Sequence, residues 1–156
     1  MSSQVLSDQA LAAWIAFIRG HATLIRSLNA QLVADHGLTI NDYEVMLRLS
    51  RAPERRLKRV ELAQSVLLTP SGITRLLDGL ETAGWVEKAS CESDARITYA
   101  VLTEHGLAKL HEAADSHLGD IDRVFAAQFD TDELEMLAAL LSRLDAGDSS
   151  DECRPG

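Results

Sequence analysis

Residues 62–106 read LAQSVLLTPSGITRLLDGLETAGWVEKASCESDARITYAVLTEHG, and they carry the most informative structural pattern in the chain. Its first half carries apolar residues at three- and four-residue steps, which indicates helices. Thr69 and Pro70 mark the start of the second helix, because threonine can cap a helix and proline lacks an N–H that the first turn leaves unpaired. The second half is rich in β-branched and aromatic residues and predicts strands over 85–88 and 97–102. We therefore predict two short helices followed by a β-hairpin.

The two helices have the spacing of a helix-turn-helix. Ala63 is small where the helices must approach closely, and Ile73 and Leu76 follow ten and thirteen residues later, where the second helix needs apolar anchors. A hairpin directly after the second helix makes this a winged helix-turn-helix. The alternative is an ordinary helical hairpin whose polar side chains only face solvent.

Helical periodicity continues on both sides of this stretch. We predict a long first helix over 8–36 that ends at Gly37, and a second helix that begins near residue 39 and ends before Pro53. Downstream, the pattern predicts helices over 104–125 and 131–144. The predicted fold is mainly α with a small β-hairpin wing (α+β). A first helix of about 28 residues would be roughly 42 Å long, so something else must pack against it.

Composition excludes several classes of protein. Of the 156 residues, 46% are hydrophobic and 25% are charged, as in globular domains. The longest apolar runs are far shorter than the ~20 residues needed to cross a bilayer, so we expect no membrane association. No secretory signal pattern opens the chain, and two cysteines fit a reducing compartment. We expect a cytoplasmic protein that is associated with the nucleoid when it is bound to DNA.

The charge is unevenly distributed along the chain. Residues 38–103 hold nine Lys or Arg and nine Asp or Glu, so the net charge of −9 lies wholly in the flanking segments. A segment of zero net charge that contains a basic cluster and lies between acidic segments is typical of a protein that binds a polyanion. The alternative is that the basic cluster is only a solvated surface. Six of the nine central bases fall within twelve residues: Arg48, Arg51, Arg55, Arg56, Lys58 and Arg59.

The stretch 62–106 is similar to the MarR (multiple antibiotic resistance regulator) family of bacterial transcription factors. Its most specific pieces are TRLLDGLETAGWVEK over 74–88, and SDAR followed by AVLTEHG around the predicted wing. The order of the outlying helices also matches, so the resemblance covers about residues 7–144. It implies a homodimer that binds pseudo-palindromic promoter DNA and acts as a repressor.

The resemblance also implies a division of the chain into regions. Residues 7–37 and 104–146 would form a helical dimerisation region built from both termini, and 38–103 would form the winged helix-turn-helix DNA-binding region. The polar tail over 147–156 is expected to be disordered.

The helix that begins at Pro70 is expected to enter the major groove by its N-terminal turns. Arg75 can form bidentate hydrogen bonds with a guanine edge. The hydroxyl groups of Ser71 and Thr74, and the N–H groups of the first helical turn, can contact phosphates or bases. Gly72 removes side-chain bulk where backbone meets DNA, unless it is simply a tolerated first-turn glycine. The candidate DNA-binding residues of this helix are Thr69, Ser71, Gly72, Thr74 and Arg75. The basic cluster is expected to contact phosphates through Arg55, Arg56, Lys58 and Arg59.

In the wing, Arg96 matches the family position that inserts into the minor groove, where narrow A·T-rich stretches concentrate negative potential. Asp94 matches the acid that supports this arginine. The family commonly places a second base between them, but Ala95 stands here. A tip with two acids and one base predicts a wing that grips DNA weakly.

The resemblance further implies release from DNA by a small ligand, often phenolic or anionic, that binds between the dimer helices and the DNA-binding region. The residues that could line such a pocket by position are Trp14, Ile18, His21, Tyr43 and Met46. The alternative is that these five are plain core residues.

Other functions have weaker signals. His111 and Asp115 share a helical face and could supply two zinc ligands, as in a metal-responsive regulator, but surface positions explain them too. Cys91 could sense oxidants, although Cys153 lies far along the chain. A winged helix that binds protein partners is an alternative, which acids in place of Arg75 and Arg96 would have favoured. No catalytic arrangement, metal site or cofactor motif appears, so we expect no enzyme activity.

Overall fold

The computed structural model describes residues 5–66 and 70–145. The predicted cap Thr69 and the tail over 147–156 lie outside the described residues. The chain divides into two units, one ending at Asp120 and the other beginning at Ile121. Among the described residues, no helix combines the length and apolar character that spanning a membrane requires.

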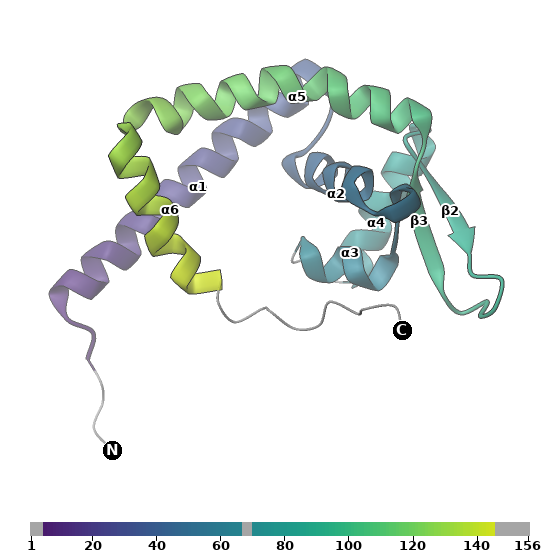
Figure 1. Ribbon diagram of the computed structural model, residues 1–156, viewed down its shortest axis with the longest axis horizontal. Helices are drawn as coiled ribbons and strands as arrows, with labels where there is room; N and C mark the ends of the chain where they lie inside the picture. Colours follow the sequence, from purple (N-terminus) through teal and green to yellow (C-terminus); the bar gives the residue numbers. More distant parts are fainter. Residues whose placement is uncertain (1–4, 67–69, 146–156) are drawn as a thin grey trace. The chain divides into compact units, whose positions relative to one another are not determined.

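The described residues contain six α-helices, two short 3-10 helices and one three-stranded sheet, which confirms the predicted fold class (Figure 1). In chain order the elements are α1 (Asp8–His36), α2 (Ile40–Arg51), the 3-10 helix η1 (Pro53–Arg55), β1 (Arg56–Lys58), α3 (Arg59–Ser65), α4 (Pro70–Thr82), β2 (Val86–Ser90), β3 (Thr98–Leu102), α5 (Glu104–Val124), the 3-10 helix η2 (Ala126–Gln128) and α6 (Thr131–Asp145).

Local capping explains where several helices begin and end. Ser7 accepts a hydrogen bond from the first turn of α1, and Gly37 ends that helix in the left-handed conformation, at φ +68°, that glycine adopts without strain. Thr39 and Asp42 form a reciprocal capping box at the start of α2. The cap of α6 is Asp130, one residue before the predicted start of that helix.

The sheet has one more strand than the sequence predicts. Its order is β1–β3–β2 with both pairs antiparallel, and Leu57 of β1 lies opposite Ala100 of β3. The predicted hairpin is present as β2 and β3, whereas the strand over residues 56–58 is not indicated by the sequence. Three residues of Arg-Leu-Lys carry too little pattern to indicate a strand, and only the pairing with β3 defines this short edge.

The core of the first unit joins α2, α3, α4 and the sheet. Ala63 and Ile73 are both buried, so α3 and α4 approach each other as the helix-turn-helix pattern predicts. In Figure 1, the β2–β3 hairpin extends beyond the helices as a wing. The buried cluster comprises Leu32, Leu38, Tyr43, Val45, Met46, Leu49, Leu62, Ala63, Ile73, Leu77, Leu80, Val86, Ala100, Leu102, Leu110 and Ala113.

The start of α5 is fastened to the turn between α4 and β2. Thr103 donates its hydroxyl proton to the carbonyl of Gly84 at 2.7 Å and accepts the N–H of Gly106 at 2.9 Å. The backbone comes so close here that a Cβ atom on Gly106 would lie 2.1 Å from the Trp85 carbonyl oxygen. Glycine is therefore required at position 106 for steric reasons.

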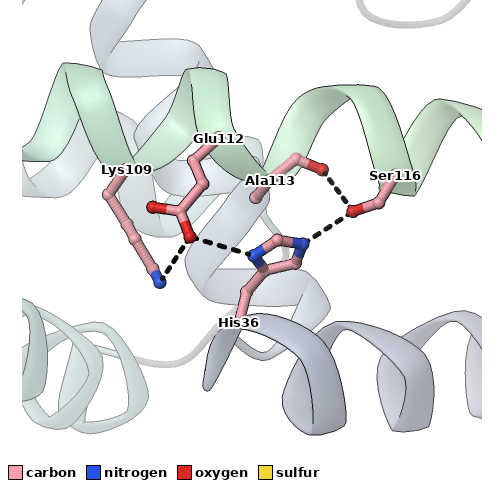
Figure 2. A network of polar contacts seen from close by, with 5 residues as sticks. All are labelled: His36, Lys109, Glu112, Ala113 and Ser116. Atoms are coloured by element: carbon pink, nitrogen blue, oxygen red, sulfur yellow. Dashed lines mark hydrogen bonds and ion pairs between the residues drawn. The ribbon is translucent and has the colours of Figure 1, made fainter.

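A network of polar contacts joins the C-terminal end of α1 to α5 (Figure 2). His36, the last residue of α1, shares a hydrogen bond of 2.6 Å between its Nε2 atom and the hydroxyl of Ser116, and that hydroxyl lies 3.2 Å from the carbonyl oxygen of Ala113. The other ring nitrogen lies 3.8 Å from a carboxylate oxygen of Glu112, which also faces Lys109. These contacts fix the point where the long helix turns into α2.

The neighbouring α5 residue, His117, packs into the core. The residue is 5% exposed, and its ring lies 4.5 Å, centroid to centroid, from the ring of Tyr43 on α2. Burial lowers the pKa of His117, because the charged imidazolium loses its hydration, and the charges of Asp120 and Glu44 oppose this effect only in part. The folded state therefore favours the neutral ring.

We expect Gly106→Ala to destabilise the protein by about 1–3 kcal/mol, because the new methyl group overlaps backbone that cannot move away freely. Gly79→Ala is the control, since nothing lies within 4 Å of a Cβ there. Gly79→Ala should raise the unfolding free energy by roughly 0.5–1 kcal/mol, because alanine has less conformational freedom than glycine in the unfolded chain. Urea unfolding of both variants measures the difference, and equal stabilities would contradict the steric argument.

The stability should also depend on pH through His117. Its folded pKa is lowered, while the unfolded chain binds a proton near the ordinary value of about 6.5. The unfolding free energy therefore has its full value above that pH. It falls as the pH drops below it, because the unfolded chain then binds a proton at His117 more readily than the folded chain does. His117→Phe should flatten this dependence below about pH 7.5. His111→Gln, an exposed change on the same helix, should not.

Candidate nucleic-acid interface

The exposed side of α4 follows from its buried side. Ile73, Leu77 and Leu80 are at most 3% exposed and hold the helix against the core. At 100° per residue, this burial turns Arg75 outward and leaves Thr74 half-buried beside it. The residues that line one open hollow of about 550 Å³ on this side are Ser71, Thr74, Arg75 and Asp78. Gly72 is half-buried.

A carboxylate therefore shares the outward side with Arg75, which the sequence analysis missed. Asp78 Oδ1 accepts a hydrogen bond from Lys88 Nζ of β2 at 2.8 Å, and the same Nζ lies 3.1 Å from Glu81. The hydrogen bond from Lys88 lowers the pKa of Asp78, and the two carboxylates raise the pKa of Lys88. Asp78 follows Thr74 by four residues, so helical spacing could have placed it on the same side of α4. No local sequence pattern indicates that it pairs with Lys88.

The wing tip is built around Asp94. Its Oδ1 atom accepts hydrogen bonds from the backbone N–H of Arg96 at 3.0 Å and from the guanidinium Nε at 3.2 Å. The Asp94 carbonyl also accepts the N–H of Ile97, which closes the turn. The Arg96 side chain is 91% exposed. The structure thus brings together the acid and the arginine that the resemblance pairs, with the cation presented to solvent.

Cys91 lies at the base of this tip. Its Sγ atom is 3.1 Å from the hydroxyl of Ser93. Hydrogen bonds from Ser93 and from the backbone of Asp94 lower the pKa of the Cys91 thiol. Cys153 lies outside the described residues.

The basic cluster is not a uniform phosphate-binding surface. The Arg55 guanidinium forms an ion pair with Glu104 at the start of α5, and the Arg56 guanidinium lies 4.3 Å from the centre of the Tyr99 ring. Arg59 is half-buried, and only Lys58 of these four is classed as exposed. Arg55 and Arg56 therefore each have a partner within the protein, and phosphate contact by these two arginines stays a prediction.

The five candidate ligand-pocket residues do not share one environment. Tyr43 and Met46 are buried in the core of the first unit, as the alternative reading expects. Trp14 and Ile18 are 58% and 41% exposed, and His21 is also exposed. Within residues 5–66 and 70–145, no group of three or more His, Cys, Asp or Glu side chains could hold a metal ion, and this includes the surroundings of His111 and Asp115.

Comparison with known protein sequences places the chain beside transcriptional regulators. Residues 36–97 match the model of the MarR family. The chain is 32% identical to the transcriptional repressor YetL of Bacillus subtilis over 114 residues, covering 71% of this chain and 68% of that protein. It is 24% identical to the regulator MhqR of the same species over 139 residues, covering 89% and 93% of the two chains.

Solved structures give the same result over nearly the whole length. The MarR family regulator AbsC from Streptomyces coelicolor superposes with a TM-score of 0.83 at 30% identity, covering 92% of this chain and 97% of that chain. Sco3205, a MarR family regulator from the same species solved in complex with DNA, has a TM-score of 0.87 at 26% identity and covers 97% and 94%.

Proposed function

The chain belongs to the MarR family of transcriptional regulators, and from this premise we propose that it is a homodimeric, sequence-specific repressor that a small ligand releases from DNA. The observation that carries the proposal is the joint exposure of two arginines on a winged helix-turn-helix: Arg75 on α4 and Arg96 at the wing tip. The similarity to a regulator that was solved with DNA supports the same assignment.

The two arginines suit different parts of a DNA duplex. An arginine on the first turns of a helix can reach guanine in the major groove, whereas a flexible arginine at a hairpin tip suits the narrow minor groove. In this proposal Ser71, Thr74 and Lys58 contact the phosphate backbone and set the register of the helix. Asp94 keeps the guanidinium of Arg96 close to the tip until DNA binds.

The proposed homodimer would bury the apolar surface that the terminal helices expose in a single chain. Only Leu28 and Leu32 of α1 are buried, although the helix has 29 residues. We propose that residues 7–37 and 104–146 form the dimer interface around a two-fold axis, which would place two copies of 38–103 on a pseudo-palindromic site. The exposed large apolar residues are Leu11, Trp14, Ile15, Phe17, Ile18, Ile25 and Val33 on α1, and Met136, Leu140, Leu141 and Leu144 on α6.

The proposed release signal is a small phenolic or anionic compound. Trp14, Ile18 and His21 offer exposed aromatic and aliphatic surface on α1 that a second copy could close into a pocket. Tyr43 would act from the core side, through its packing against His117. A repressor of this kind works in the cytoplasm, on the nucleoid.

Light scattering of the full-length protein should give twice the chain mass of 17.0 kDa. Trp14→Glu places a charge on the proposed interface and should lower the measured mass toward one chain at micromolar concentration, with loss of tight DNA binding. Gln64→Glu, which adds the same charge at an exposed position of α3 outside both proposed interface ranges, is the control for the measured mass. A wild-type monomer that still binds DNA tightly would contradict the proposed assembly.

The DNA-binding proposal is tested with the genomic fragments that the protein retains from its own genome. On such an operator, Arg75→Ala should lose on the order of 1–3 kcal/mol of binding free energy, with little loss on random DNA. Lys58→Ala should weaken binding to both DNAs alike and reduce the dependence on salt, because it removes a phosphate contact. Equal losses for Arg75→Ala on both DNAs would show that this arginine does not read bases.

A further inference from the structure

The Asp78–Lys88–Glu81 cluster, which we call the α4–β2 bridge, is not explained by DNA contacts of the two arginines. Asp78 stands three residues after Arg75, so both side chains lie on the same side of α4 and line the same hollow. Asp78 is 55% exposed, and Glu81 is 42% exposed, one helical turn further on. The helix that would enter the major groove thus carries two carboxylates near its reading side.

Two carboxylates close to DNA oppose binding, since the phosphate backbone repels them. Lys88 is placed to counter this effect, because its ammonium group lies 2.8 Å from Asp78 and 3.1 Å from Glu81. The hydrogen bond also lowers the pKa of Asp78, so the carboxylate stays ionised and stays paired. One lysine therefore offsets part of the negative charge of both acids.

The bridge also connects the two DNA-contacting elements. Lys88 lies on β2, the strand that leads into the wing, while Asp78 and Glu81 lie on α4. Within the core, Leu80 and Val86 pack on either side of the short α4–β2 connection, and the N–H of Trp85 donates to the carbonyl of Leu80. Outside the core, the lysine adds side-chain ion pairs between α4 and the wing strand.

We propose that Lys88 is a positioning residue for DNA recognition. It acts through Asp78 rather than by gripping a phosphate itself, because its ammonium group is already shared between two carboxylates. By pairing with Asp78, Lys88 reduces the repulsion between this carboxylate and the DNA phosphates. The same contact keeps α4, and with it Arg75, in a fixed orientation relative to the wing. This inference rests on the proposed DNA-binding function.

The test is a double-mutant cycle on the full-length protein, with the genomic operator and a random duplex at several salt concentrations. Lys88→Met should weaken operator binding by about three- to tenfold at low salt, and the loss should shrink as salt rises. Lys88→Arg should retain most of the affinity. In the Asp78→Asn background, Lys88→Met should cost much less than in the wild type, because the carboxylate it serves is gone.

Lys58→Met is the matched control, since it removes a cation that is proposed to contact phosphate directly. Its cost should be the same with Asp78 or Asn at position 78. Thermal unfolding of Lys88→Met should stay close to that of the wild type, because exposed ion pairs contribute little to stability.

Three outcomes would overturn the inference: Lys88→Met binds like the wild type, it costs as much in the Asp78→Asn background, or Lys88→Arg loses as much affinity. Each of these leaves the wild-type preference for the operator intact, so the proposed function would stand. A wild type that binds operator and random DNA equally would overturn both proposals.

Discussion

The burial of one side of α4 is the constraint on which the DNA-binding surface depends. Ile73, Leu77 and Leu80 pack into the core of the first unit, and their burial determines the rotation of the helix about its own axis. Arg75 faces outward because of this rotation, and so does Asp78. A shift of the apolar stripe by one position would turn the arginine by 100° and remove it from the surface.

Charge pairing is the second constraint on this region. Residues 38–103 contain equal numbers of acids and bases, so the region cannot attract a polyanion through its total charge. Attraction depends instead on which cations are engaged inside the protein and which reach solvent. Arg55 is paired with Glu104 and Arg56 covers the Tyr99 ring, and both are partly buried, whereas Arg96 is paired with Asp94 but keeps a side chain that is 91% exposed. The local arrangement of ion pairs therefore matters more than the composition.

The contacts of α5 with α1 and α2 suggest how the terminal helices and the DNA-binding region are related within the first unit. Ser116 binds His36 at the end of α1, and the next residue, His117, packs against Tyr43 of α2. A change in the position of α5 would alter both contacts at once. This is the physical route by which we propose that ligand binding beside α1 affects the DNA-binding region.

Periodicity, caps and turn residues act over a few neighbouring positions, so the helices, the helix-turn-helix, the wing and the family resemblance could be predicted from the sequence. Arg75 and Arg96 could be named as candidates in the same way. The third strand over residues 56–58, the contacts of Arg55 and Arg56 within the protein, and the bond between Lys88 and Asp78 are visible only in the folded chain. These features join residues that are distant in sequence or belong to different elements. Their pairing depends on how the backbone brings the elements together, and local pattern carries no information about it.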